Sequence, residues 1–234
     1  MKLKTKKNEY DHFVKLSNEW WDENGKFAVL HKIRPLRMSY ILNQIKEKNI
    51  KNLEILDVGC GGGLICEPLS RLGAKVTGID YVPDNIKIAN THSKKKRLKI
   101  NYICDDIENI KFNKKFDLII IFEVLEHLDN WEYFILKIKK NLKFNGKILI
   151  STINRNIFSK YLTIFFAENI LNWIPRGTHQ YEKFIRPEEI RSFSKKNNLE
   201  FGNLEGLIYN PISSSWNLSK NSKINYFCSL KRVN

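Results

Sequence analysis

The sequence predicts an α/β fold built around a mostly parallel, doubly wound β-sheet. A strand, a glycine-rich turn, a helix and a second strand follow one another between Leu53 and Asp80. Farther along the chain, apolar strand-like runs alternate with helical segments, as in sheets whose parallel strands are joined by crossover helices. One run, Phe116–Phe122 (FDLIIIF), is apolar almost throughout, which is typical of a central strand buried on both faces.

Length and composition limit the protein to a few classes. A chain of 234 residues is long enough for one α/β domain, so we expect residues 1–234 to form a single domain. The net charge of +15 indicates nucleic acid only weakly, because the lysines are scattered among many Asn and Ile residues, as a coding bias toward A and T would produce. The four cysteines form no C-x-x-C pair. Without a signal peptide or a spanning run, we expect a cytoplasmic protein, at most peripheral on the inner face of the cell membrane.

The first 50 residues are expected to form helices that precede the sheet. Apolar residues recur at helical spacing from Asn8 to Trp21, and a loop follows over Asp22–Lys26. Pro35 is suited to the first turn of a helix, so it predicts the start of a second one within residues 30–45.

The glycine-rich turn is the first candidate site. Glycines such as Gly59 and Gly61 permit positive φ and close approach of a ligand to the backbone. Asp80 follows the first glycine by roughly 20 residues, where a ribose diol is bound in doubly wound folds. The dinucleotide pattern G-x-G-x-x-G fails at Leu64, and Asp57 suits a cationic methionine moiety better than a pyrophosphate. We therefore expect S-adenosylmethionine rather than a dinucleotide.

The middle of the chain continues the strand–helix alternation. A helix over Pro83–Lys96 and a strand over Ile100–Cys104 lead to Asp106, which either reaches the adenine amino group or serves an exposed turn. A helix over Trp131–Leu142 and a strand over Gly146–Thr152 follow the central strand. Ligands are expected at the carboxyl-terminal edge of such a sheet.

Residues 154–186 interrupt this rhythm as a helical insertion. Tyr161–Ile174 is apolar almost all round, too short to span a bilayer and flanked by basic residues. It is either a lid over an acceptor pocket or a contact with anionic membrane lipid, and we expect the membrane contact. A helix from Pro187 and two strands, over Leu199–Ile208 and Ile224–Leu230, complete the chain.

Glu123, Glu126 and His127 follow the central strand and form the second candidate site. A helical turn would place all three on one face, where two carboxylates and an imidazole could bind Mg²⁺ or Zn²⁺. Alternatively, Glu123 contacts the ligand while Glu126 and His127 have structural roles. A phenolic methyl acceptor, with a pKa near 10, would need activation by such a cation or by His127 or His179 as general base.

Several segments resemble one family, the bacterial ubiquinone-biosynthesis O-methyltransferases, which methylate polyprenylated catechols. The tryptophan-rich entry and the STINRN, PRGTH and YNP motifs are the specific part of this resemblance, which covers nearly the whole chain from Trp20. The matching segments are WWDENGKFAVLHKIRPLR (20–37), LDVGCGGGL (56–64), VTGID (76–80), EVLEHL (123–128), STINRN (151–156), ENILNWIPRGTH (168–179), KFIRPEE (183–189) and GLIYNPI (206–212).

The resemblance implies a class I, Rossmann-like methyltransferase with a seven-stranded sheet whose last strand is antiparallel. It implies that S-adenosylmethionine contacts Arg37, Gly59, Asp80 and Phe122, the last replacing a methionine of similar proteins. It also implies a divalent cation, Mg²⁺ or Zn²⁺, on the three residues Glu123, Glu126 and His127.

The substrates implied are an early polyprenyl catechol and, later, demethylubiquinol; other enzymes of ubiquinone synthesis are possible partners, and nucleic acid is not expected. A methyltransferase acting on RNA or on another small metabolite is the alternative that the charge suggests. The chain lacks the Asn/Asp-Pro-Pro-aromatic motif of base-amine methylation. A lipid-binding module without catalysis would require that no donor binds.

Overall fold

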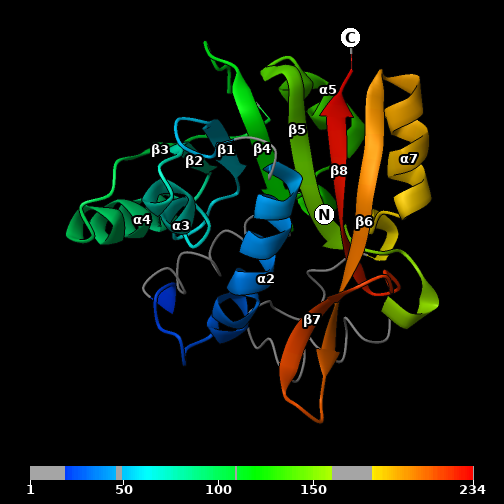
Figure 1. Ribbon diagram of the computed structural model, residues 1–234, viewed down its shortest axis with the longest axis horizontal. Helices are drawn as coiled ribbons and strands as arrows, with labels where there is room; N and C mark the ends of the chain where they lie inside the picture. Colours follow the sequence, from blue (N-terminus) through cyan, green and yellow to red (C-terminus); the bar gives the residue numbers. More distant parts are fainter. Residues whose placement is uncertain (1–18, 46–48, 109, 160–180, 234) are drawn as a thin grey trace.

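The computed structural model describes residues 19–45, 49–108, 110–159 and 181–233, and an eight-stranded sheet of order β3-β2-β1-β4-β5-β8-β6-β7 forms its centre (Figure 1). The strands are β1 (Glu54–Val58), β2 (Lys75–Asp80), β3 (Ile100–Cys104), β4 (Phe116–Phe122), β5 (Leu142–Ile153), β6 (Leu199–Asn210), β7 (Ser215–Ser219) and β8 (Asn225–Arg232). The described helices are α2 (Ala28–Ile45), α3 (Cys66–Arg71), α4 (Pro83–Lys95), α5 (Trp131–Lys139) and α7 (Pro187–Lys196), with the 3₁₀ helices η2 (Leu125–His127) and η3 (Tyr181–Lys183).

The strand order places a topological switch point at β1. The pairs β1–β2, β2–β3, β1–β4 and β4–β5 are parallel. From β1 the chain proceeds outward to β2 and β3, and it then returns to the other side of β1 to form β4 and β5. The carboxyl ends of β1 and β4 therefore flank the crevice in which doubly wound folds bind their ligands.

The far side of the sheet carries one strand more than expected. Strand β8 runs antiparallel to both β5 and β6, which confirms the antiparallel last strand. The count of seven strands is wrong, because β7 pairs antiparallel with the end of β6. Its sequence, SWNLS, is rich in turn-forming residues, and β6 continues past Ile208 to Asn210. Figure 1 shows the resulting β6–β7 hairpin, coloured orange, extending beyond the rest of the sheet.

The core consists of two apolar layers, one on each face of the sheet. Alternate residues of β4 supply both layers: Ile119 and Ile121 pack with α5 and α7, and Leu118 and Ile120 pack with α2 and α3. All four side chains are fully buried. Burial of each side chain contributes about 1.5–3 kcal/mol. Because the strand is buried on both faces, the FDLIIIF segment is the central strand that its composition predicts.

Helix α2 begins earlier than expected. It runs from Ala28 through Pro35, so the prediction that Pro35 opens a helix is wrong. A proline inside a helix removes one backbone hydrogen bond, and tertiary contacts offset that loss here. The Tyr40 ring is fully buried and its hydroxyl donates to the carbonyl oxygen of Asn203 (3.0 Å), while the Asn203 side-chain amide donates to Gln44 Oε1 (2.7 Å).

Some expectations fall outside the described residues. Tyr161–Ile174 and His179 do so, as does most of the helix expected over Asn8–Trp21. Among the helices that the structure describes, none is long and apolar enough to cross a membrane.

Candidate cofactor site and active site

The glycine-rich turn connects β1 to α3 and is fixed against β2. The amides of Gly59 and Cys60 both donate to the carbonyl oxygen of Ile79, at 2.8 and 3.0 Å. Gly59 and Gly61 have φ values of +68° and +53°, in the region that side chains disfavour. A Cβ at Gly59 would lie 2.6 Å from Val124 Cγ2, and one at Gly61 would lie 2.3 Å from the Trp20 ring. Both glycines are therefore needed by the protein's own packing.

Asp80 fastens this turn to the end of β2. Its Oδ2 accepts from the amide of Gly61 (2.9 Å), and its Oδ1 accepts from the amide of Val82 (2.9 Å) and from the side chain of Asn85 (3.3 Å). Burial raises the pKa of Asp80, and these three donors oppose that rise. A carboxylate offers about four lone-pair positions, so it retains capacity for a further donor such as a ribose hydroxyl.

Asp57 and Arg37 lie together at the switch point. Asp57 is the second-last residue of β1, and its carboxylate accepts from the Cys66 thiol (3.2 Å). Burial raises the pKa of Asp57 to about 7, although that thiol and Arg37 lower it. Arg37 comes from α2, and its guanidinium lies 3.6 Å from Glu123 Oε1 and 5.6 Å from the centre of the Phe122 ring. Burial lowers the pKa of Arg37, against the attraction of Glu123 and other nearby carboxylates.

One atom of Arg37 points to a ligand. Its Nε is buried and has no hydrogen-bond partner among the residues that the structure describes. Buried donors are nearly always paired, so this N–H fits a ligand acceptor. The carboxylate of the methionine moiety of S-adenosylmethionine would supply one, and its ammonium group would lie among carboxylates such as Asp57.

Two other expected cofactor contacts lie at or just beyond the carboxyl ends of β4 and β3. Phe122 ends β4, is 8% exposed and packs edge-on against Phe227, with 5.3 Å between the ring centres. Asp106 is exposed after β3, and its Oδ1 accepts from the amide of Glu108 (2.9 Å), as in the turn alternative. A contact between Asp106 and adenine stays a prediction.

Glu123 follows β4 in a strained conformation. Its φ of +54° is unusual for a side-chain-bearing residue and costs on the order of 1–3 kcal/mol. Two hydrogen bonds to Ser151 hold it: its amide donates to the Ser151 carbonyl (3.0 Å), and its Oε1 accepts from the Ser151 hydroxyl (2.7 Å). Such strain is common at functional sites, and here it lies beside Arg37.

Glu126 lies deeper, in η2. Its Oε2 accepts from the hydroxyl of Thr152 at 2.9 Å, and its side chain is almost completely buried. Burial raises its pKa to about 8; the negative charge of Glu123 raises it further, and His127 opposes the rise. The two carboxylates are thus close enough to interact.

The third expected metal ligand is His127, which follows Glu126 in η2. Glu123 precedes this 3₁₀ helix and has a positive φ, so the three residues do not share one helical turn as expected. The described part of the chain contains no group of three His, Cys, Asp or Glu residues that could hold a metal ion. The carboxylate pair fits a divalent cation in charge and chemistry, but a three-ligand site is not formed.

Four further residues complete the site and were not predicted as functional. Ser151 and Thr152 hold the two glutamates, and Trp20 and Asn85 extend the hydrogen bonds of Asp80, because the Trp20 indole donates to Asn85 Oδ1 (2.7 Å). The serine and threonine lie in the STINRN segment, whose family-specific sequence was the signal available for them.

Comparisons with known proteins agree with this geometry. A family model described as a methyltransferase domain matches residues 30–202. The ubiquinone biosynthesis O-methyltransferase of Pelagibacter ubique is 43% identical over 228 residues, which cover 94% of this chain and 95% of that protein. The protein of the same name from Rickettsia canadensis is 44% identical and covers 97% of each chain. The chain belongs to the ubiquinone biosynthesis O-methyltransferase family.

Solved structures of other methyltransferases share the fold of this family member. Magnesium protoporphyrin IX methyltransferase of Synechocystis, solved with S-adenosylhomocysteine (SAH), superposes with a TM-score of 0.64 at 16% identity, covering 86% of this chain and 83% of that one. The plantazolicin methyltransferase BpumL gives 0.62 at 19% identity over the full length of both chains. The class I methyltransferase fold is thus confirmed, and S-adenosylmethionine is the methyl donor of this O-methyltransferase family member.

Proposed function

We propose that this protein transfers the methyl group of S-adenosylmethionine to catechol hydroxyls of polyprenylated intermediates in ubiquinone synthesis. The two acceptors would be an early 2-polyprenyl-6-hydroxyphenol and the later 3-demethylubiquinol. The observation that carries the proposal is the similarity to relatives of that name over 94% and 97% of this chain.

The residues after β4 suit a catechol. Methyl transfer is an in-line displacement in which a phenolate oxygen attacks the methyl carbon and the bonding electron pair returns to sulfur. The acceptor must first lose its proton, because a phenol with a pKa near 10 is mostly protonated at neutral pH. A catechol offers two adjacent O–H donors, from which Glu123 and the ionised form of Glu126 can accept hydrogen bonds. Because burial raises the pKa of Glu126 to about 8, closer to that of a phenol, its ionised form is the stronger base for removal of the proton.

A divalent cation, Mg²⁺ or Zn²⁺, belongs to the same proposal. Glu123 and Glu126 would hold it, with His127 as a third ligand after rearrangement of the turn. When bound, the cation would lower the pKa of the catechol hydroxyl. The alternative is a general base, either His127 or His179, and thorough chelation separates the two: activity that survives it favours the base.

The activity is tested with labelled donor and a short-chain demethylubiquinol analogue under reducing conditions, with Mg²⁺ or Zn²⁺ present. We expect a methoxy product, and Glu126→Gln should reduce turnover far more than donor affinity. A protein that binds donor yet gives no methoxy product would contradict the proposal. Binding of bulk RNA that persists at high salt would instead favour an RNA methyltransferase.

We also propose that the insertion binds the surface of anionic membranes, where polyprenylated substrates reside. At its start, Ile157 and Phe158 are 62% and 59% exposed, and the Lys223 ammonium lies 5.7 Å from the centre of the Phe158 ring. Exposed apolar side chains beside a basic group are suited to an anionic lipid interface.

Vesicle sedimentation tests this contact. The wild type should sediment with vesicles that contain anionic lipid and much less with neutral ones, and Ile157→Ser with Phe158→Ser should reduce that recovery. Phe144→Ser is the matched control, because Phe144 is similarly exposed (61%) but lies near the opposite end of β5. Equal recovery of the wild type and the double variant would favour the lid interpretation of the insertion.

A further inference from the structure

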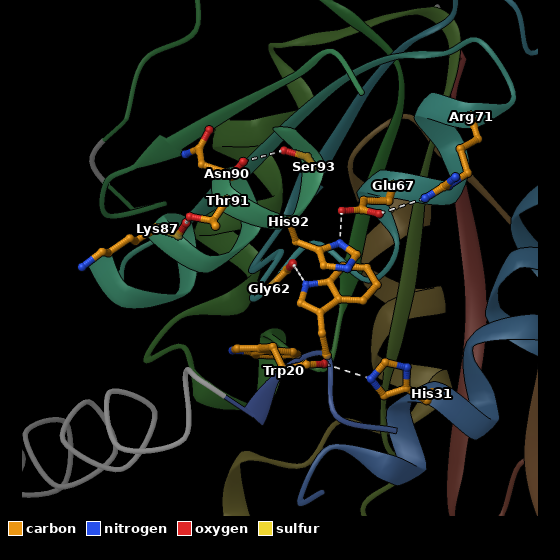
Figure 2. Close-up of polar contacts among 11 residues, drawn as sticks. Trp20, His31, Gly62, Glu67, Arg71, Lys87, Asn90, Thr91, His92 and Ser93 are labelled. Carbon is orange, nitrogen blue, oxygen red and sulfur yellow. Dashed lines mark hydrogen bonds and ion pairs between the residues drawn. The ribbon is translucent and has the colours of Figure 1, made fainter. Parts of the chain in front are cut away.

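Two consecutive tryptophans cover the glycine turn (Figure 2). The Trp20 ring lies so close that a Cβ at Gly61 or Gly62 would approach it to 2.3 or 2.5 Å. The Trp21 indole N–H donates to the carbonyl oxygen of Gly62 at 3.1 Å. The segment before α2 is therefore held directly on the turn that binds the donor.

Trp21 is held in place from its other side by a hydrogen-bonded pair, His92 and Glu67. Its indole stacks on the imidazole of His92 in α4, with the ring centres 3.5 Å apart and the planes 10° from parallel. His92 Nδ1 lies 2.6 Å from Glu67 Oε1, and Arg71 Nη2 lies 3.4 Å from the other Glu67 oxygen. Figure 2 shows Arg71, Glu67 and His92 in sequence, with the imidazole stacked on the neighbouring indole.

This arrangement exceeds what packing alone requires. The Glu67 side chain is only 2% exposed, and burial of a carboxylate is costly unless it is paired. An aliphatic side chain could support an indole at lower cost. A hydrogen-bonded imidazole, by contrast, has a fixed ring plane, which fixes the plane of the stacked indole and directs its N–H to Gly62.

The same segment reaches the ribose side of the donor site. The Trp20 indole donates to Asn85, whose side-chain amide donates to Asp80. Displacement of the tryptophans would therefore disturb both the glycine turn and the ribose carboxylate.

We propose that Trp21, His92 and Glu67 form a latch, the Trp21 latch, that closes the entry segment over the glycine turn and slows departure of S-adenosylmethionine and of SAH. The three are positioning residues, because they act through the turn and not on the reacting atoms. The proposal rests on the donor and not on the identity of the acceptor.

The test is the dissociation rate of SAH from the full-length protein, measured by rapid displacement. His92→Ala removes the stacking partner, and we expect dissociation about fivefold to a hundredfold faster, the range for one lost stacking contact and one lost hydrogen bond. The KM for the donor should rise more than kcat changes. Thr91→Ala is the matched control, because Thr91 is the exposed neighbour of His92 and its hydroxyl donates to the carbonyl oxygen of Lys87 within α4 (2.8 Å; Figure 2).

Two further variants separate the latch from a general structural role. Glu67→Gln keeps an oxygen that can accept from His92, so SAH release should stay as slow as in the wild type. Glu67→Leu is of similar size but has no acceptor, so it should release SAH rapidly. Trp21→Phe keeps a ring for stacking but loses the donor to Gly62, so it should also accelerate release, and it supplies the measurement if His92→Ala does not fold.

The proposal is overturned if His92→Ala, or Trp21→Phe in its place, releases SAH no faster than Thr91→Ala, or if Glu67→Gln and Glu67→Leu behave alike. SAH release requires no acceptor. Failure of catechol methylation would therefore leave this measurement intact, and the two proposals fail separately.

Discussion

Asp80 joins three parts of the donor site, because its carboxylate accepts hydrogen bonds from Gly61, Val82 and Asn85. Asp80→Ala should weaken S-adenosylmethionine binding by about tenfold or more, since a charge-assisted hydrogen bond is worth roughly 1.5–3 kcal/mol and the turn would also lose its anchor. Calorimetric titration of the variant, with its fold checked by circular dichroism, measures the effect. Wild-type affinity in a folded variant would mean that another carboxylate binds the ribose.

Asp57 should make donor binding depend on pH. Burial raises its pKa to about 7 in the free protein, and the cationic methionine moiety should lower that pKa by favouring the carboxylate. Binding then releases a proton below about pH 7, so donor affinity should rise from pH 5.5 to pH 7 and level off above. Calorimetric titration in buffers of different ionisation enthalpy measures how many protons are released for each donor molecule bound. Asp57→Asn should remove the dependence, and an unchanged dependence in that variant would exclude Asp57 as its source.

The local sequence predicts the positions of some residues of the candidate site and not of others. The positions of Asp57 and Asp80 beside the glycine turn were predictable, because both lie at the carboxyl ends of apolar strands and parallel strands place those ends at one edge. Their contacts with the donor stay predictions. Trp20 was expected only as one of the apolar residues at helical spacing. Its hydrogen bond to Asn85 joins residues 65 positions apart, which no local pattern encodes. The relation of Glu123 to Glu126 and His127 depended on where the helical turn begins. The positive φ of Glu123, which excludes it from that turn, has no signal in the local sequence.

At the scale of elements, β6 contains two glycines with different surroundings. A Cβ at Gly206 would lie 1.8 Å from the carbonyl oxygen of Asn221, whereas one at Gly202 would lie 3.3 Å from the Ser229 hydroxyl. Gly206→Ala must displace backbone and should lower the free energy of unfolding by about 2 kcal/mol or more, and Gly202→Ala should change it by less than about 1 kcal/mol. Denaturant titration compares them. Equal free energies of unfolding for the two variants would mean that the backbone at Asn221 shifts at little cost to accommodate the added methyl group.

The elements that were predicted well are those with strong periodicity or continuous apolarity. The expected strand over Phe116–Phe122 has the observed bounds, and the expected helix at Pro83 ends within one residue of α4. Helix α2 was placed too late because Pro35 resembles a first-turn residue, while the contacts that stabilise the helix around it come from distant β6. Strand β7 was missed because pairing with β6 overrides the turn preference of its serines and asparagine.

At the scale of the whole molecule, buried acids should make the unliganded protein less stable as the pH rises. The pKa of Asp57 rises from 3.8 to about 7 on folding and that of Glu126 from 4.5 to about 8, in both cases chiefly through burial. At a pH between the unfolded and folded pKa values, the native state holds a proton that the unfolded state lacks. The free energy of unfolding therefore falls with rising pH, on the order of 1 kcal/mol per pH unit for each group.

Denaturant titrations at pH 5.5 and pH 8 measure this fall as a lower midpoint at pH 8, and Glu126→Gln should reduce the difference between the two midpoints. A higher midpoint at pH 8 would contradict the expectation.

Helix α2 is held by a residue far along the chain, and this has a consequence during synthesis. Tyr40 and Gln44 bond to Asn203, which follows them by 163 and 159 residues. At about 5–20 residues per second, a ribosome needs roughly 10–30 s to translate the interval between them. For that time α2 can pack against β4 but lacks its hydrogen bonds to β6. The helix that carries Arg37 therefore gains the last of these contacts only after most of the chain has been translated.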